Sequence, residues 1–521
     1  MSATLQTQGR RGTGASTRTS TDAADSRRWS ILAVLGIAQL MVVLDATIIT
    51  IALPSAQQAL GFANADRQWV ITAYTLAFGG LLLVGGRLSD LLGRKRTFLI
   101  GLVGFATASA VGGLSISFLM LVAARAVQGA FAALLAPSAL SLLTTTFADR
   151  KDRGKAFGIY GGIASGGAAL GLLLGGTLTE YLDWRWTLYV NVAFATVAGI
   201  GALVFLVDRG RASERRIDVP GAVAVVAGLA SIVFGLNEAE TRGWADPFTL
   251  SLLLVGPALL GIFAWIETRA AEPLLPFGVV KQRNRVGSYL AVFSSGIATF
   301  GTFVFLTFYF QQILDYSPIV TGLAYLPLVG ALAVTSITAN AVLLRRIGPR
   351  PLLSTGFVIA AAGLLLISRV GIDTSYLTGI MPGLVLVGIG LGAVFPPALN
   401  TATYGVPTSD AGVASALVTT SQQIGASVGT ALLSTVAASA TTQYLAHRNP
   451  TSVVTAMATV HGYNVASLVA VGILLGSAVI CGLIVTNRPY AEGGAVTTRG
   501  RRTHGNPPRA RRHDRSPVPG R

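Results

Sequence analysis

The chain has 521 residues, of which 52% are apolar and only 12% are charged, and its formal net charge at pH 7 is +17. Soluble globular proteins carry about twice that share of charged residues, so the composition excludes a large water-exposed surface and indicates a membrane protein. The positive charge does not indicate nucleic-acid binding, because the basic residues lie in short segments between apolar runs and form no basic domain with interleaved aromatics.

Residues that could build a catalytic or metal site are scarce. The single cysteine, Cys481, lies inside an apolar run, and the four histidines do not show a metal-ligand spacing. None of the lysines occupies a G-x-x-x-x-G-K-[ST] loop, the motif that cradles the phosphates of ATP. We therefore predict no metal site, no cofactor and no enzymatic activity, and any energy-requiring step needs another source than ATP bound in such a loop.

Apolar runs dominate the chain after a polar segment of 28 residues, which we predict to be disordered. A helix that crosses a bilayer needs about 20 mostly apolar residues, and fourteen runs approach or exceed that length. The predicted spans are 30–53, 68–88, 98–116, 118–147, 156–178, 186–207, 217–236, 250–266, 286–311, 319–344, 352–368, 377–399, 412–437 and 465–485.

Basic residues divide unequally between the two sides of these predicted spans. With the N-terminus in the cytoplasm, 33 Lys and Arg residues fall on the cytoplasmic side and five on the outer side, while Arg125 falls within a span. Positive charge accumulates in cytoplasmic loops, and one missed or invented span would invert every loop beyond it. The distribution therefore predicts an even number of spans in the cell membrane, with both termini cytoplasmic.

Two similar basic turns indicate an internal repeat, although short cytoplasmic loops are often basic in any case. Asp-Leu-Leu-Gly-Arg-Lys-Arg at 90–96 follows the second span, and Arg-Arg-Ile-Gly-Pro-Arg at 345–350 follows the tenth. If spans seven and eight are an insertion, each half has six spans, as in transporters whose repeats enclose a midplane site. The predicted all-α membrane protein then has a tail, a six-helix bundle, two additional helices, a second bundle and a basic disordered tail, at 1–28, 29–208, 209–268, 269–488 and 489–521.

Asp45 and Arg125 are charged residues placed deep within predicted spans. Asp45 lies eight residues before the outer end of the first span, about 12 Å deep, and Arg125 lies seven residues into the fourth span from the same side. A charge at that depth is costly and marks an ion path or a pair. Protonation or substrate binding would break such a pair and favour a conformational change. The alternatives are a structural ion pair or a helix-end hydrogen bond for Asp45, and a side chain that snorkels or bonds backbone carbonyls for Arg125.

A glycine-containing turn connects the second and third spans. Gly86 and Asp90 lie at the inner end of the second span and precede Gly93 and Arg94. Asp90 could cap the next helix or pair with a basic neighbour, and making and breaking such a contact would favour one state of a transporter. We predict a gating role for these four residues, with a simple turn as the alternative.

Glycines recur every four residues in the fifth span. Gly167, Gly171 and Gly175 share one helix face, which permits close helix approach, and we expect this stripe where two moving bundles pack and slide. Polar side chains within other spans are candidates for the lining of a cavity, although each could instead make only helix-to-helix hydrogen bonds. These candidates are Tyr74, Gln128, Tyr160, Asn191, Gln422 and Gln423.

Four motifs in order resemble the major facilitator superfamily and, within it, the fourteen-span drug:proton antiporters. Leu-Asp-Ala-Thr-Ile-Ile-Thr-Ile-Ala-Leu-Pro at 44–54 resembles the first-span motif L-D-x-T-[IV]-[IV]-N-[IV]-A-L-P. Residues 86–95 match the loop signature G-x-L-a-D-r-x-G-r-k, and residues 125–132 resemble R-x-x-q-G-x-g-a. Trp-Arg-Trp at 184–186 with Asn-Val at 191–192 is similar to the W-R-W…N-V entry to span six, so the resemblance covers about residues 30–488.

The resemblance implies a usually monomeric exporter of drug-like hydrophobic or amphipathic molecules that exchanges them for protons by alternating access. It also implies proton coupling by Asp45 and Arg125, and gating by the 86–94 loop. Two positions depart from the motifs: Thr50 replaces the usual Asn, and Leu172 follows Gly171 where the fifth-span motif G-P-x-x-G-G has proline. Loss of that proline removes a kink-former and bears on the direction of transport rather than on the fold.

Other functions remain open at this point. The same fold could serve a uniporter or an importer of a metabolite. A membrane enzyme would need a nucleophile or metal constellation, and a sensor would need a folded soluble domain, and we find neither in the sequence. The expected partners are therefore a small-molecule substrate, protons and the lipid bilayer, without nucleic acid.

Overall fold

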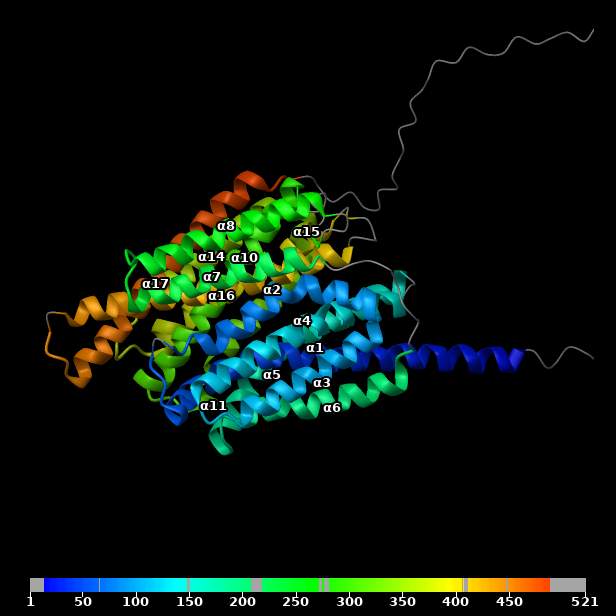
Figure 1. Ribbon diagram of the computed structural model, residues 1–521, viewed down its shortest axis with the longest axis horizontal. Coiled ribbons are helices and arrows are strands. Elements are labelled where there is room, and N and C mark those ends of the chain that lie inside the picture. The colour runs from blue at the N-terminus through cyan, green and yellow to red at the C-terminus, as the bar shows by residue number, and fades with distance from the viewer. Residues whose placement is uncertain are drawn as a thin grey trace, which may run out of the picture.

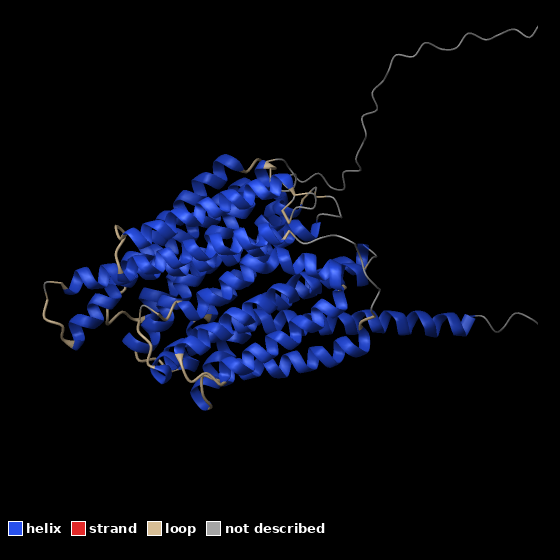
Figure 2. Cartoon of the chain, in the orientation of Figure 1, coloured by secondary structure: helices blue, strands red, loops and turns tan. Residues whose placement is uncertain are grey.

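The computed structural model is a set of long helices that lie side by side along one axis (Figure 1). It describes residues 14–64, 66–147, 150–207, 218–270, 274–275, 281–404, 406, 411–446 and 448–487. Within these ranges there is no β-strand, as Figure 2 shows. Fourteen helical segments of this part of the chain are long and apolar enough to cross a membrane, which confirms the predicted number of spans.

The first six spans form the N-terminal bundle. In it α2 packs on α4, α3 packs on α4 and α6, and α1 packs on α5 and α6. Helix α1 begins at Gly14, so part of the N-terminal segment predicted to be disordered is helical, whereas residues 1–13 lie outside the described ranges. The helices are α1 (Gly14–Leu60), α2 (Trp69–Leu92), α3 (Arg94–Gly113), α4 (Phe118–Thr146), α5 (Arg150–Tyr181) and α6 (Trp186–Phe205).

The last six spans form the C-terminal bundle, in which three spans contain a π-helical segment. Such segments insert an extra residue into a helical turn and often occur at functional sites. The elements are α10 (Arg283–Phe308), η1 (Tyr309–Ile313), α11 (Pro318–Ala324), α12 (Leu326–Thr338), η2 (Ala339–Leu343), α13 (Leu344–Ile347), α14 (Pro349–Ile367), η3 (Tyr376–Ile380), α15 (Met381–Thr403), α16 (Ala411–Leu445) and α17 (Ser452–Ile484).

Spans seven and eight, α7 (Val219–Thr241) and α8 (Pro247–Arg269), pack on each other, and α7 also packs on α2 and α16. Thr435 of α16 donates a hydrogen bond to the carbonyl oxygen of Leu236 at 2.8 Å, and Gln68 before α2 hydrogen bonds to Asn237. The additional pair therefore covers the seam where α2 of one bundle meets α16 of the other.

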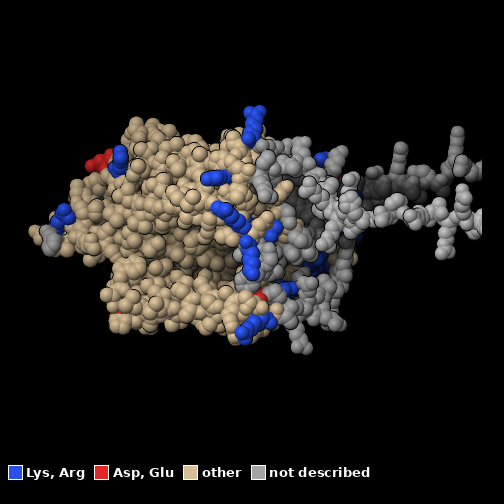
Figure 3. Space-filling model, turned by 90° about the horizontal axis from the view of Figure 1, so that it is seen from above, with Lys and Arg blue, Asp and Glu red and all other residues tan. Residues whose placement is uncertain are grey.

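The turns of the proposed repeat have similar backbones. Gly93 joins α2 to α3 with φ 92°, and Gly348 joins α13 to α14 with φ 80°. L-residues with a side chain rarely adopt that region, so glycine is required at both turns. We call the end of the molecule with these two turns the basic end; in Figure 3 most visible Lys and Arg side chains form a band toward one end.

Besides the seam between α2 and α16, the two bundles touch at the end opposite the basic end. Glu180 at the end of α5 accepts hydrogen bonds from Ser317 Oγ at 2.8 Å and from the Ile319 backbone N–H at 2.9 Å. Arg67, which precedes α2 and is 7% exposed, stacks its guanidinium 4.1 Å from the ring centre of Phe308. Toward the basic end of α5, in contrast, a Cβ added at Gly162 would meet no atom within 4 Å.

Candidate functional site: a buried carboxylate in the N-terminal bundle

Asp45 lies in the middle of α1, where the neighbouring side chains are apolar and buried. Leu44, Ile48, Ile49 and Asp45 itself are all 0% exposed. A charged carboxylate in such surroundings is costly unless it is paired and hydrogen-bonded, so its contacts decide whether it is tolerated.

Three side chains from two other helices bind the Asp45 carboxylate. Arg125 Nη1 of α4 donates to Oδ2 at 2.7 Å, which confirms that the two charges predicted at one depth meet. Gln128 Nε2 of α4 and Asn191 Nδ2 of α6 both donate to Oδ1, each at 2.7 Å. One cation and two amides thus replace the water that the carboxylate would otherwise bind.

Further contacts hold the Arg125 side chain. Its Nη1 also donates to Gln128 Oε1 at 2.6 Å, and its Nε donates to the carbonyl oxygen of Val70 at 3.1 Å. The guanidinium lies 4.3 Å from the ring centre of Tyr74, in the range of a cation–π contact. A Cβ at Gly129 would collide with the backbone of Tyr74, so glycine at that position lets α4 approach α2 closely enough for these contacts.

The whole network is sealed from solvent in this conformation. Asp45 and Asn191 are 0% exposed, and Arg125, Gln128 and Tyr74 are 1% exposed. Removal of one partner from a buried ion pair usually costs several kcal/mol, because the remaining charge stays desolvated. A proton can therefore exchange with Asp45 only after the helices around it move, so protonation and conformation are physically linked at this site.

A family model described as Major Facilitator Superfamily matches residues 35–430. The chain belongs to this superfamily. It is 49% identical over 469 residues to the puromycin resistance protein pur8 of Streptomyces alboniger, with 90% of this chain and 93% of that protein covered. It is 41% identical over 407 residues to the cephamycin export protein CmcT of Amycolatopsis lactamdurans, with 78% and 84% covered.

Solved structures agree on the superfamily fold. A bacterial homolog to the human lysosomal transporter Spinster, in an inward-facing and unoccupied conformation, matches with a TM-score of 0.62 and 16% identity, and covers 88% of this chain and 97% of that one. A POT family transporter, PepTSo, matches with a TM-score of 0.64 and 13% identity, and covers 88% and 97%. Family and fold make the chain a multi-pass membrane transporter with two six-helix bundles and two additional helices.

The predicted cavity-lining residues separate into two groups. Tyr74, Gln128 and Asn191 surround Asp45 and Arg125 inside the bundle instead of lining an open cavity. The other three lie elsewhere. Half-buried Tyr160 donates to Gln39 Oε1 at 2.7 Å, buried Gln423 lies where a Cβ at Gly79 would meet it, and Gln422 is half-buried.

The glycine stripe of α5 packs inside one bundle of the superfamily fold, and not between two bundles as we expected. Cβ atoms at Gly167, Gly171 and Gly175 would press on Leu40, Thr47 and Ile48, which all belong to α1. The neighbouring glycine, Gly176, lies at a contact between the bundles, because a Cβ there would lie 2.6 Å from the Pro318 carbonyl oxygen. The spacing predicted a close contact correctly but could not identify the partner helix.

The gating role of the loop at 86–94 remains a prediction. A Cβ at Gly86 would lie 3.8 Å from Pro137, so α2 passes close to α4 there. The Nε atom of Arg94 is buried without a hydrogen-bond partner, and the side chain of Asp90 lies outside the described part of the structure. Gly93 has the positive φ that the turn requires.

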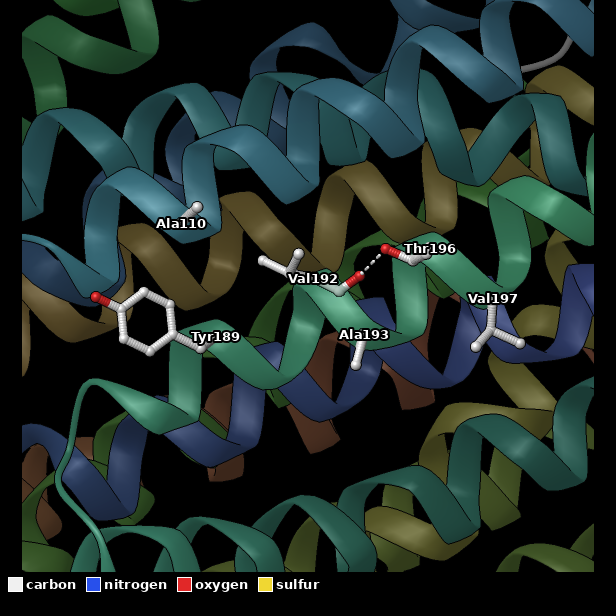
Figure 4. Close-up of a pocket in the computed structure, with 6 residues that line it drawn as sticks. All are labelled: Ala110, Tyr189, Val192, Ala193, Thr196 and Val197. Carbon is white, nitrogen blue, oxygen red and sulfur yellow. Dashed lines mark hydrogen bonds between the residues drawn. The ribbon is translucent and has the colours of Figure 1, made fainter.

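Two further features belong to the site and its surroundings. Ser109 of α3 accepts a hydrogen bond from Gln128 Nε2 at 2.7 Å, a contact that sequence reasoning missed because one serine in an apolar span is a weak signal. A shallow apolar groove lies between α3 and α6, and it contains none of the Asp45 ligands. Figure 4 shows its lining residues: Ala110, Tyr189, Val192, Ala193, Thr196 and Val197.

Proposed function

We propose that this chain exports drug-like hydrophobic or amphipathic small molecules across the cell membrane by alternating access, in exchange for inward-moving protons. The observation that carries the proposal is the 49% identity with a puromycin resistance protein over nearly the whole length of both chains. The cephamycin export protein is a second relative whose name describes removal of an antibiotic.

Asp45 and Arg125 supply the proton-coupling step in this proposal. The carboxylate is the only acidic side chain in the centre of the N-terminal bundle among the described residues, and it is fully buried against one cation. Because it lies inside that bundle, substrate and proton do not compete for one open site in this conformation. Coupling instead proceeds through movement of α1 and α4, which carry the ion pair.

The basic end faces the cytoplasm in this proposal, together with both termini, as the distribution of Lys and Arg favours. The bundle contacts of Glu180 and Arg67 then close the outer side. Closure of the outer side is what a state that receives substrate from the cytoplasm or the inner leaflet requires.

Inside-out vesicles with an acidic lumen test the proposal with puromycin as the probe. Wild-type protein should accumulate puromycin and dissipate the pH gradient. For each proton exchanged, the ratio of lumenal to external puromycin should rise about tenfold per pH unit. Asp45→Asn should equilibrate puromycin without accumulation, since an amide cannot carry the proton. A uniporter would equilibrate the probe without using the gradient, and an importer would not fill the lumen.

Asp315→Asn is the matched control for the charge change. Asp315 is exposed at the end of the molecule opposite the basic end and has φ 53°, a conformation that Asn tolerates well. This variant should accumulate puromycin like the wild type at equal membrane abundance. Full gradient-driven accumulation by Asp45→Asn would disprove proton coupling through Asp45.

A further inference from the structure

The two oxygens of Asp45 differ in their capacity to accept a proton. Oδ1 accepts two amide N–H groups, from Gln128 and Asn191, whereas Oδ2 accepts one N–H from Arg125 among the described contacts. Each carboxylate oxygen has about two lone-pair sites. Oδ1 is therefore occupied, and Oδ2 has the free site where a proton can bind.

Arg125 has other acceptors if protonation weakens its bond to Oδ2. Gln128 Oε1 and the Val70 carbonyl oxygen already accept from it, at 2.6 and 3.1 Å, and the face of Tyr74 lies beside it. The guanidinium thus keeps partners in both protonation states, and binding of one proton changes the charge of the Asp45–Arg125 pair from zero to +1.

Asn191 has an unused acceptor next to the carboxyl group. Its Nδ2 donates to Asp45 Oδ1, but its own Oδ1 is buried and has no hydrogen-bond partner. An unsatisfied buried amide oxygen costs about 1–3 kcal/mol, so a donor that reached Asn191 Oδ1 would stabilise the site. A protonated carboxyl group supplies the missing O–H donor.

We propose that Asn191 is a positioning residue that binds neutral Asp45 as a two-hydrogen-bond acid–amide pair. The proton binds Asp45 Oδ2, and Arg125 turns to Gln128 and Val70. The new O–H of Asp45 then donates to Asn191 Oδ1, while Asn191 Nδ2 keeps its bond to Asp45 Oδ1. The exchange moves Asp45 Oδ2 from a partner on α4 to a partner on α6, while Gln128 of α4 keeps its bond to Asp45 Oδ1. It rests on the proposed proton coupling and specifies how the protonated state is stabilised.

The surroundings of Asp45 offer few competing groups. Among the described residues, Arg125 of α4 and Tyr74 of α2 are the titratable side chains that face it. Helix α3 reaches the network through Ser109, which contacts Gln128, and α5 packs on α1 there with Gly171 and Gly175. The hydroxyl of Tyr74 is buried without a partner, but it is not hydrogen-bonded to the carboxylate.

Infrared pH titration of the full chain in liposomes tests the pair without a substrate. The C=O stretch of a protonated carboxyl group should appear on acidification and be absent from Asp45→Asn. In Asn191→Leu this band should move to higher wavenumber, because the carbonyl loses one donor and the O–H loses its acceptor. Gln128→Met removes a donor to Asp45 Oδ1 and an acceptor of Arg125 but leaves the acceptor of the new O–H in place, so it should move the band less.

Asn464→Leu is the matched control, since Asn464 is a half-buried amide of α17 that donates to the Val370 carbonyl oxygen far along the chain. It should leave the band unchanged, and Asn191→Ser serves if Asn191→Leu does not fold. An unmoved band in the Asn191 variant, or a larger shift in Gln128→Met, overturns the acid–amide pair alone. Absence of any Asp45-dependent band at all pH values overturns proton coupling through Asp45 as well.

Discussion

The two bundles share a helical plan but differ in the chemistry of their interiors. The N-terminal bundle buries an ion pair with two amides bound to it. Helices α10 to α17 contain no Asp or Glu, and the polar contacts in their interior include hydroxyl groups, such as Ser477 with Ser294 at 2.7 Å. One chain can therefore hold a buried carboxylate in one bundle, while the helices of the other bundle contain hydroxyl and aromatic groups and no acidic side chain.

The aromatic side chains reinforce this difference. Phe310 of η1 contacts Tyr316, Tyr325 and Tyr376, and Phe303 lies 4.7 Å from Tyr325 between ring centres. All of these residues belong to the C-terminal half. If ionic coupling belongs to one half alone, substitutions in the N-terminal bundle should change proton dependence, and substitutions in the C-terminal bundle should change only stability or substrate binding.

Arg125→Leu should have the largest effect on this comparison. It leaves the Asp45 carboxylate buried without a cation, which costs about 3–5 kcal/mol in comparable pairs. We expect a large fall in the melting temperature of the purified protein and no gradient-driven transport. Asp45→Asn combined with Arg125→Leu should recover much of the stability and none of the transport. If Arg125→Leu alone were as stable as the wild type, the assigned ion pair would be contradicted.

Particular residues show how far sequence reasoning could reach. Hydropathy and the distribution of Lys and Arg between the two sides of the membrane predicted fourteen spans, because both depend on the bilayer rather than on tertiary contacts. Counting along the spans also placed Asp45 and Arg125 at one depth. The orientation of Gln128 and Asn191 toward Asp45 could not be predicted, because helix rotation is set by packing, and the same holds for the partner of Gly171.

Gly171→Ala should have an intermediate effect, because the added Cβ would collide with Thr47 Oγ1 of α1. Overpacking of this kind typically costs about 1–3 kcal/mol, and separation of α1 from α5 would also disturb the helix that carries Asp45. Gly162→Ala on the same helix is the control, since its Cβ would meet nothing within 4 Å. Thermal unfolding should show a loss for the first variant and none for the second; equal losses would refute the packing argument.

Tyr325→Phe should have the smallest effect and tests the C-terminal half. The buried hydroxyl donates to the Phe303 carbonyl oxygen at 2.8 Å and lies 3.0 Å from Thr307 Oγ1. Its removal should lower the free energy of unfolding by only about 1 kcal/mol, because Thr307 can turn its hydroxyl to its own helix backbone. The pH dependence of puromycin accumulation should match that of the wild type, since no ionic group is changed. A shifted pH dependence would mean that the C-terminal bundle takes part in proton coupling, and the division between the two halves would then fail.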